Sequence, residues 1–338
     1  MENSIFKKEE MTQTQRSVIA VDIGGSKIMT AAFSEDGHVL ARDIVPTRVE
    51  DGVNKVISRL SGAIETLLDQ NVTEIDRLSG IGIACAGGVD SERGIVVTPS
   101  PNLPDWVDIH LADIIRGRFN TNTFIVNDAS AAALGESRFG AGKGAKNIVL
   151  LTVGTGIGGG IIINDELYLG ARGGAGELGH MSIDANGPKC GCGNLGCLEM
   201  MASGKAVTRE AVRRIKNGEK SMMTDMVEGK VDGITVENIA IAANSGDIMA
   251  LDVMNRAAYY LGIGIVNLVN IFNPDMIIIG GGMSELGEML IGPGRRLVKE
   301  RAFSISSQAV RIVTAQLGNE AGIYGAAAYV RDRIRKIK

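Results

Sequence analysis

One pattern occurs three times in this chain of 338 residues and limits the folds open to it: an apolar run that ends in a cluster of glycines. The three stretches are VDIGGSK (21–27), VGTGIGGG (153–160) and IIIGGGM (277–283). Each apolar run predicts a buried strand, and each glycine cluster predicts a tight turn at its end. Glycine also lets backbone N–H groups approach phosphate oxygens, although packing between strands would explain any single turn equally well.

The first two stretches belong to a longer internal repeat. Residues 19–40 align without a gap with residues 149–170, and both copies have the pattern strand, glycine turn, strand, turn, strand. Such a duplication predicts two related α/β domains that face each other across a cleft. We expect a disordered tail (1–16), a smaller α/β domain (17–127 plus 318–338) and a larger α/β domain (128–317).

Helical periodicity separates the predicted strands. Val56, Ile57, Leu60 and Ile64 fall on one face of a helix predicted over residues 51–69. An alanine-rich helix is expected after the apolar strand TFIVND (123–128). Further helices are predicted near residues 201–216, 234–245, 247–271, 284–301 and 318–338.

The composition argues against nucleic acid and membranes as partners. Aromatic residues make up 4% of the chain and the formal net charge is −4, which leaves little surface for base stacking or for binding polyanions. The polar N-terminus lacks the apolar core of a signal peptide, and the best apolar run, residues 261–272, is too short to span a membrane. We expect a soluble cytoplasmic protein whose thiols are reduced.

The stretch GELGHMSIDANGPKCGCGNLGCLE (176–199) holds three of the four cysteines and one of the three histidines. Because reduced thiols seldom form structural disulfides, the cluster indicates metal binding or chemistry. The stretch alone leaves a metal site, a redox site and part of an active site open.

The second glycine cluster contains G-x-G-x-x-G, from Gly154 through Gly156 to Gly159. A dinucleotide-binding fold requires a helix to begin at this loop. Here IIINDELYLG (161–170) follows and resembles the second strand of a hairpin. The pattern therefore favours a hairpin turn whose backbone N–H groups hold phosphate oxygens over a nicotinamide-dependent oxidoreductase.

Three charged residues at the ends of predicted strands have a functional and a simpler explanation. Asp22 follows a buried strand and could bind Mg²⁺, usually through water, or it could cap the turn. Lys27 could reach a phosphate or remain in solvent. Asp128 lies between a strand and a helix, where it could be a general base or an N-cap.

Six motifs in one order carry a family resemblance. They are DIGGSK (22–27), VND (126–128), VGTGIGGG (153–160), GELGH (176–180), CGCGNLGCLE (190–199) and IIIGGGM (277–283). Through these motifs, which span nearly the whole chain after residue 16, the protein resembles the ROK family of sugar kinases and sugar-responsive repressors. The resemblance implies an α/β, actin-like, ribonuclease-H-like fold in which two domains close over ATP and a hexose.

The resemblance also assigns the site residues. Asp128 matches the catalytic base, which takes the proton of the sugar hydroxyl that attacks the γ-phosphorus. The residues that match sugar ligands are Asn102, Asn127, Asp128, Glu177, His180 and Glu199. The residues that match positions near the nucleotide and its Mg²⁺ are Asp22, Gly24, Gly25, Ser26, Lys27, Gly154, Thr155, Gly156 and Gly281.

The cysteine-rich stretch is then explained as a structural zinc site in the loop 180–197. His180, Cys190, Cys192 and Cys197 supply four soft or borderline ligands, as a closed tetrahedral Zn²⁺ site requires. One ring nitrogen of His180 stays free, and in the family it faces the sugar. Zinc would thus fix the loop that carries Glu177 and Glu199.

These observations predict an ATP-dependent hexose kinase that phosphorylates the 6-hydroxyl, with glucose favoured. N-Acetylmannosamine kinase, N-acetylglucosamine kinase and fructokinase are the alternatives, since CAGGVD (85–90) lacks the proline that family glucokinases often carry between the glycines. A sugar-sensing repressor is disfavoured because 16 residues before the first strand are too few for a helix-turn-helix. The resemblance further implies a homodimer or homotetramer.

Overall fold

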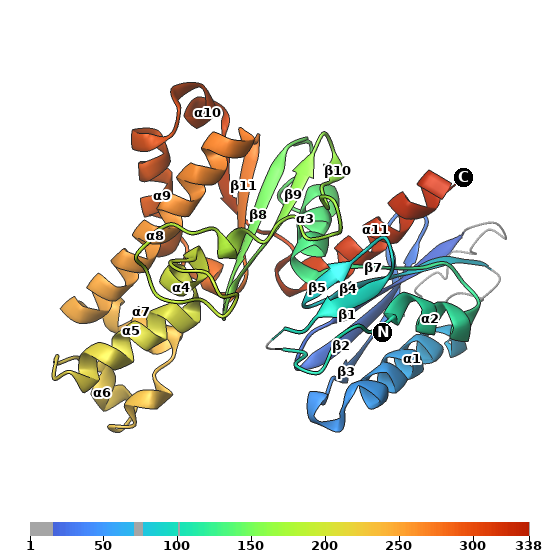
Figure 1. Ribbon diagram of the computed structural model, residues 1–338, viewed down its shortest axis with the longest axis horizontal. Coiled ribbons are helices and arrows are strands. Elements are labelled where there is room, and N and C mark those ends of the chain that lie inside the picture. Colours follow the sequence, from blue (N-terminus) through green and yellow to red (C-terminus); the bar gives the residue numbers. More distant parts are fainter. Residues whose placement is uncertain (1–15, 71–76, 101, 338) are drawn as a thin grey trace, which may run out of the picture. The chain divides into compact units, whose positions relative to one another are not determined.

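A computed structural model describes residues 16–70, 77–100 and 102–337, so the predicted tail lies outside the described residues except for Arg16. The chain forms two compact units (Figure 1). The first comprises the chain up to Val89, residues 93–126 and the chain from Ala326; the second comprises residues 90–92 and 127–325. The boundaries at 127/128 and 317/318 between the smaller and the larger domain expected from the sequence stay predictions.

The first unit is built on a five-stranded sheet with the order β3-β2-β1-β4-β7. Strand β1 pairs antiparallel with β2 and parallel with β4. Helix α1 buries the predicted face, including Val56, Leu60 and Ile64, in a core that it shares with α2. The elements up to the end of this sheet are β1 (Ser17–Ile23), β2 (Lys27–Ser34), β3 (Val39–Pro46), α1 (Val53–Asp69), β4 (Leu78–Cys85), β5 (Gly88–Asp90), β6 (Ile95–Thr98), α2 (Leu111–Phe119) and β7 (Thr123–Asn127).

The second unit holds a five-stranded sheet with the order β10-β9-β8-β11-β12. Strand β8 pairs antiparallel with β9 and parallel with β11, which is parallel to β12. The elements are α3 (Asp128–Phe139), β8 (Ile148–Val153), β9 (Ile157–Ile163), β10 (Glu166–Leu167), η3 (Leu178–His180), α4 (Leu198–Ala202), α5 (Gly204–Lys216), α6 (Met223–Met226), α7 (Val236–Asn244), α8 (Ile248–Phe272), β11 (Met276–Gly280), η5 (Gly282–Leu286), α9 (Glu288–Arg301), α10 (Ser304–Ala309) and β12 (Arg311–Thr314). The last helix, α11 (Ala321–Ile337), begins in this unit and belongs to the first unit from Ala326 onward.

The two sheets confirm the internal repeat and correct its alignment. In each sheet a three-strand antiparallel part is followed, beside its first strand, by a parallel strand. The hairpins differ in register, because Ile23 pairs with Ile28 whereas Val153 pairs with Ile157. The second glycine turn is therefore one residue shorter, and the alignment predicted without a gap needs one at the turn.

Each unit has its own apolar core. In the second unit the long helix α8 is buried along much of its length, including Leu261, Ile265 and Leu268. Gly262 on α8 allows the close approach of Gly294 on α9, since a Cβ at Gly262 would lie 3.2 Å from the Gly294 Cα. Among the described residues, no helix has the length and apolar character needed to cross a membrane.

Candidate functional site

Strand β7 and helix α3 meet at Asn127 and Asp128. The side-chain oxygen of Asn127 caps the helix by accepting hydrogen bonds from the N–H groups of Ala129 (3.0 Å) and Ser130 (3.1 Å). The N-cap is thus Asn127 and not Asp128. The half-buried Asp128 lies in the first turn, where its carboxylate accepts a hydrogen bond from Ala129 N–H at 2.8 Å. Burial raises the pKa of Asp128, and the bond from Ala129 opposes that rise. Increased proton affinity suits a general base.

The turn 154–156 joins β8 to β9 and is closed by a hydrogen bond from Gly154 N–H to the Gly156 carbonyl (2.9 Å). Strand β9 follows directly, so the G-x-G-x-x-G stretch forms a hairpin and no helix opens there, as the sequence indicates. Helix α3 packs on β9, since a Cβ at Gly158 would lie 2.9 Å from the Ala129 Cβ. This contact places Ala129, the residue after Asp128, against β9 two residues beyond the turn, within the second unit.

A cavity of about 930 Å³ opens beside this turn and is lined by Gly154 and Thr155. The N-terminus of α5 forms an adjoining wall, where Gly204 N–H donates to the Gly154 carbonyl at 2.7 Å. The volume falls in the range of small-molecule pockets. The walls from α5 and α7 are not predicted by the sequence, and they include Lys205, Thr208, Thr235 and Asn244. Their residue types are ordinary for solvent-facing helices, and no motif marks them.

Gly281 supports the same cavity through packing. Its φ is +80°, and a Cβ there would lie 2.5 Å from the carbonyl oxygen of Val153, so only glycine fits against the end of β8. The next residue, Gly282, lines the cavity itself. Gly281, which is predicted to lie near the nucleotide, thus packs the loop after β11 against β8, and Gly282 lines the cavity.

The predicted zinc ligands converge. The ligand atoms of His180, Cys190, Cys192 and Cys197 all lie within 4.8 Å of one another. The Nδ1 atom of His180 lies 3.5 Å from the Cys190 Sγ, and its Nε2 atom lies 4.0 Å from a carboxylate oxygen of Glu177. One ring nitrogen therefore faces the thiols and the other faces a predicted sugar ligand. A histidine and three thiols at these separations fit a tetrahedral zinc ion.

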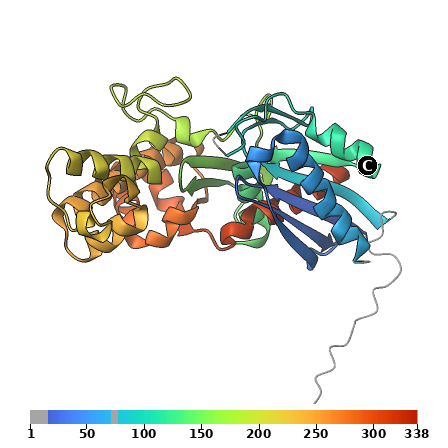
Figure 2. The same cartoon turned by 90° about the horizontal axis from the view of Figure 1, so that it is seen from below.

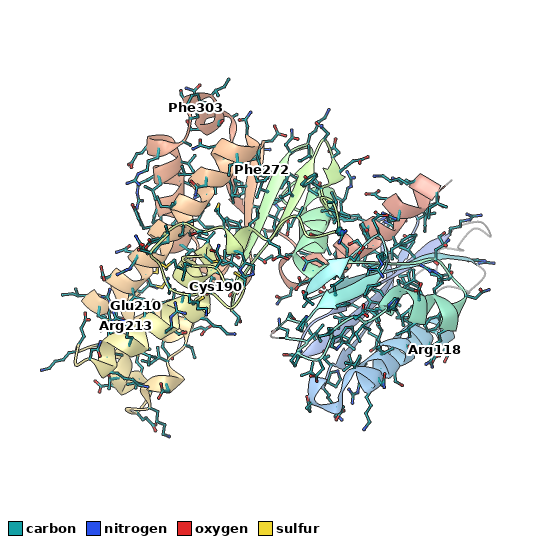
Figure 3. The ribbon with its side chains drawn as sticks, viewed as in Figure 1. Arg118, Cys190, Glu210, Arg213, Phe272 and Phe303 are labelled. Atoms are coloured by element: carbon teal, nitrogen blue, oxygen red, sulfur yellow. The ribbon has the colours of Figure 1, made fainter. Side chains whose placement is uncertain are left out.

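The loop that carries these thiols is tightly wound. Figure 2 shows it in yellow-green standing out from the helices of its unit, and Figure 3 labels Cys190 within it. The Cys190 N–H donates to the Asn194 carbonyl at 2.8 Å, and Gly196 has a φ of +62° that favours glycine. Burial raises the pKa of the Cys197 thiol to about 12, a preference for the neutral form that a bound cation would reverse.

Glu199 lies between the thiols and the glycine turn. It occupies the first turn of α4, directly after Cys197 and Leu198. Its Oε2 atom accepts a hydrogen bond from Ile157 N–H at 2.9 Å, and a Cβ at Gly156 would collide with the same oxygen. The structure thus brings a predicted sugar ligand into contact with a predicted nucleotide turn, a contact 42 residues apart in the chain.

The remaining predicted residues lie together in the first unit. The turn after β1 is closed by Gly24 N–H, which donates to the Lys27 carbonyl at 3.0 Å, and Asp22 is half-buried beside it. Gly25 lies against Asn102, because a Cβ at Gly25 would be 3.0 Å from the Asn102 Cβ. The side chains of Ser26, Lys27 and Asn102 are exposed. The residues of the first unit that are predicted to contact Mg²⁺, phosphate and sugar thus lie on the turn after β1 and at Asn102 beside it.

The family model described as ROK family matches residues 18–333. A glucokinase of Thermotoga maritima is 38% identical over 94% of this chain and 98% of its own length. The crystal structure of a ROK family glucokinase from Streptomyces griseus in complex with glucose and AMPPNP matches with a TM-score of 0.77 at 35% identity, over 94% of this chain and 99% of that one. A xylose repressor of Caldicellulosiruptor bescii is 33% identical over 93% of this chain and 78% of its own length.

Proposed function

The chain belongs to the ROK family and has its actin-like fold, and from that premise we propose that it is an ATP-dependent glucose kinase. The observation that carries the proposal is the pairing, within one unit, of a half-buried carboxylate at Asp128 with a glycine turn beside a cavity of about 930 Å³. Phosphoryl transfer requires such a base near a phosphate-binding turn. The similarity to glucokinases, one of them in complex with glucose and AMPPNP, favours glucose as the sugar and ATP as the phosphoryl donor.

In the proposed reaction Asp128 removes the proton from the 6-hydroxyl of glucose. The hydroxyl oxygen forms a bond to the γ-phosphorus of ATP, the bond from that phosphorus to the β,γ-bridging oxygen breaks, and ADP leaves. The side-chain oxygen of Asn127 caps α3 and its side chain also hydrogen-bonds Asp128. Asn127 would therefore contact the sugar through its NH₂ group, which has two donor hydrogens. Asn102, Glu177, His180 and Glu199 complete the proposed set of sugar ligands.

Two metal ions belong to the proposal. His180, Cys190, Cys192 and Cys197 would hold Zn²⁺, and their mutual distances within 4.8 Å support this assignment. Zinc supplies a fixed loop geometry and no chemical step. Asp22 would hold the Mg²⁺ that accompanies ATP, with Gly24, Gly25, Ser26 and Lys27 around the same turn. Mg²⁺ neutralises phosphate charge when it is bound.

The first test is ATP–Mg²⁺ turnover against glucose, fructose, mannose, N-acetylglucosamine and N-acetylmannosamine, with the zinc content measured on the same sample. We expect turnover to be highest with glucose, with phosphate on the 6-oxygen by NMR, and about one zinc ion per chain. Preference for an N-acetylated sugar would replace glucose within the same family. A folded, zinc-loaded sample that phosphorylates none of them would contradict the kinase proposal.

The family also contains repressors, so turnover is the measurement that separates the two classes of relative. Location in the cytoplasm and assembly into a homodimer or homotetramer stay predictions. Sedimentation of the purified protein would test the second.

A further inference from the structure

The segment from Cys197 to Lys205, here named the α4 bridge, joins three parts of the second unit. It begins at Cys197, which is a predicted zinc ligand and the N-cap of α4. It carries Glu199 in the first turn of that helix. It ends on the glycine turn, where Gly204 N–H donates to the Gly154 carbonyl at 2.7 Å. A single short segment therefore contacts the metal cluster, the expected sugar site and the wall of the cavity.

Within the α4 bridge, Glu199 holds the glycine turn by two means. Its Oε2 atom accepts the N–H of Ile157, the first residue after the turn, at 2.9 Å. The same oxygen fills the space that a side chain at Gly156 would need. Ile157 is 5% exposed, so loss of this acceptor would leave a largely buried N–H without its partner or would shift the turn.

We propose that Glu199 is a positioning residue for the nucleotide turn 154–156, in addition to its expected contact with the sugar. This inference rests on the proposed function, which makes the turn part of the nucleotide site. Glu199 keeps Gly154 and Thr155 at the wall of the cavity whether or not sugar is bound. An ionised carboxylate repels phosphate, so the property that helps the nucleotide is the acceptor oxygen and not the charge.

Glu177 provides a matched comparison, since it is also a glutamate and also an expected sugar ligand. Its side chain is 59% exposed, and its carboxylate lies 4.0 Å from the Nε2 atom of His180. Among the described residues, no hydrogen bond joins that carboxylate to the turn 154–156. A residue that acts on the sugar alone should leave nucleotide binding in the absence of sugar unchanged.

The experiment is calorimetric titration of the zinc-loaded protein with AMPPNP–Mg²⁺, with no sugar present. Glu199→Ala should weaken binding about five- to tenfold, because the turn loses the hydrogen bond that orders it in the free protein and must then be ordered when the nucleotide binds. Glu199→Gln keeps an acceptor oxygen and should bind within about twofold of the unchanged protein, or more tightly because the charge is gone. Glu177→Ala should bind like the unchanged protein.

Equal affinities for Glu199→Ala and the unchanged protein would overturn the inference, and so would an equal loss in Glu177→Ala. If Glu199→Ala does not fold, Gly156→Ala tests the same contact from the other side and should weaken AMPPNP binding, since the added Cβ displaces the carboxylate. Failure of the unchanged protein to bind AMPPNP would overturn the kinase proposal itself, which keeps the two failures distinguishable.

Discussion

Asp128 is the residue on which the proposed chemistry depends, and its environment predicts a pH profile. We expect Asp128→Asn to lower kcat by about 10³-fold, within the usual range for removal of a general base, while glucose binding by calorimetry is retained. Because burial raises the pKa of Asp128, kcat/KM of the unchanged protein should fall with decreasing pH at a pH above the ordinary aspartate value. Turnover that stays constant down to pH 4 would contradict the assignment.

The same pKa predicts the effect of this substitution on stability. A carboxyl group whose pKa is raised on folding contributes stability that is present below its unfolded pKa and is lost as pH rises through the folded pKa. Burial of the Asp128 carboxyl group therefore costs stability once the pH lies above the unfolded aspartate pKa. Asp128→Asn should raise Tm at pH 7, and the difference should vanish in acid. An inactive but more stable variant would show that the carboxylate is kept for its chemistry.

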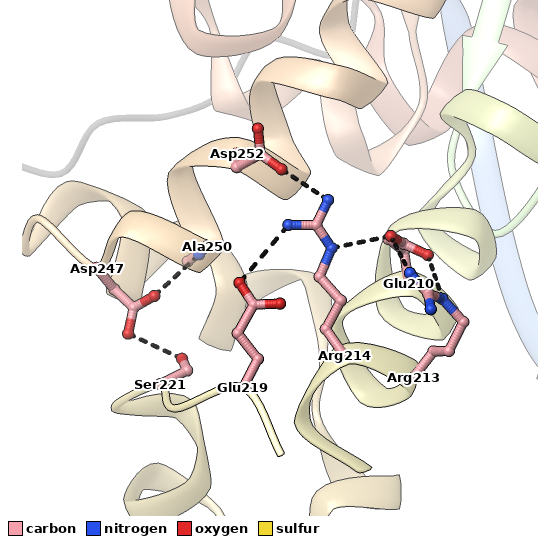
Figure 4. A network of polar contacts seen from close by, with 8 residues as sticks. All are labelled: Glu210, Arg213, Arg214, Glu219, Ser221, Asp247, Ala250 and Asp252. Atoms are coloured by element: carbon pink, nitrogen blue, oxygen red, sulfur yellow. Dashed lines mark hydrogen bonds and ion pairs between the residues drawn. The ribbon is translucent and has the colours of Figure 1, made fainter. Parts of the chain in front are cut away.

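At the scale of elements, an ionic network holds α5 against α8 (Figure 4). Arg214 on α5 donates to Glu210 at 2.9 Å and pairs with Asp252 on α8 at 2.6 Å. Arg213 adds two hydrogen bonds to Glu210, and these, together with Arg214, lower the pKa of Glu210 to about 2 against the opposing effect of burial. Since α5 also forms a wall of the cavity proposed to hold the nucleotide, the network supports that wall.

The lowered pKa predicts an acid-sensitive contribution to stability. It is present above the unfolded pKa of Glu210 and is lost as pH falls from there towards about 2. Glu210→Gln should lower the free energy of unfolding by about 1 kcal/mol at pH 7, measured by urea denaturation, and by less as the pH is lowered. Asp232→Asn is the control, because its side chain is 79% exposed and pairs only with Lys216 among the contacts described. A constant deficit at all pH values would contradict the electrostatic origin.

The elements show what the sequence could predict. Glycine clusters after apolar runs predict both hairpins, and helical periodicity predicts α1 and α8, because these signals are local. The family motifs predict that His180 and the three cysteines lie together, as they do in the structure. The one-residue difference between the two turns was missed, since low identity carries no register. The bond from Ile157 to Glu199 was also missed, because it depends on how α4 packs on the hairpin.

At the scale of the whole molecule, each compact unit has its own hydrophobic core and its own reporter. The single tryptophan, Trp106, is 2% exposed and lies in the core of the first unit. The predicted zinc cluster lies in the second unit, where Leu198, next to Cys197, packs in the other core. Because the two cores are separate, unfolding of the chain need not be a single transition.

Zinc removal should therefore act on one unit. We expect the variant Cys192→Ser, or chelation by 1,10-phenanthroline, to destabilise the second unit. The midpoint of its thermal unfolding, followed by the circular dichroism of its many helices, should fall by about 5–10 °C. The fluorescence transition of Trp106 should stay in place. Cys85→Ala is the matched control, because Cys85 is a buried thiol in the core of the first unit and should shift the Trp106 transition instead. If both transitions fall together on chelation, the units unfold as one; if neither moves, the thiol cluster binds no stabilising metal.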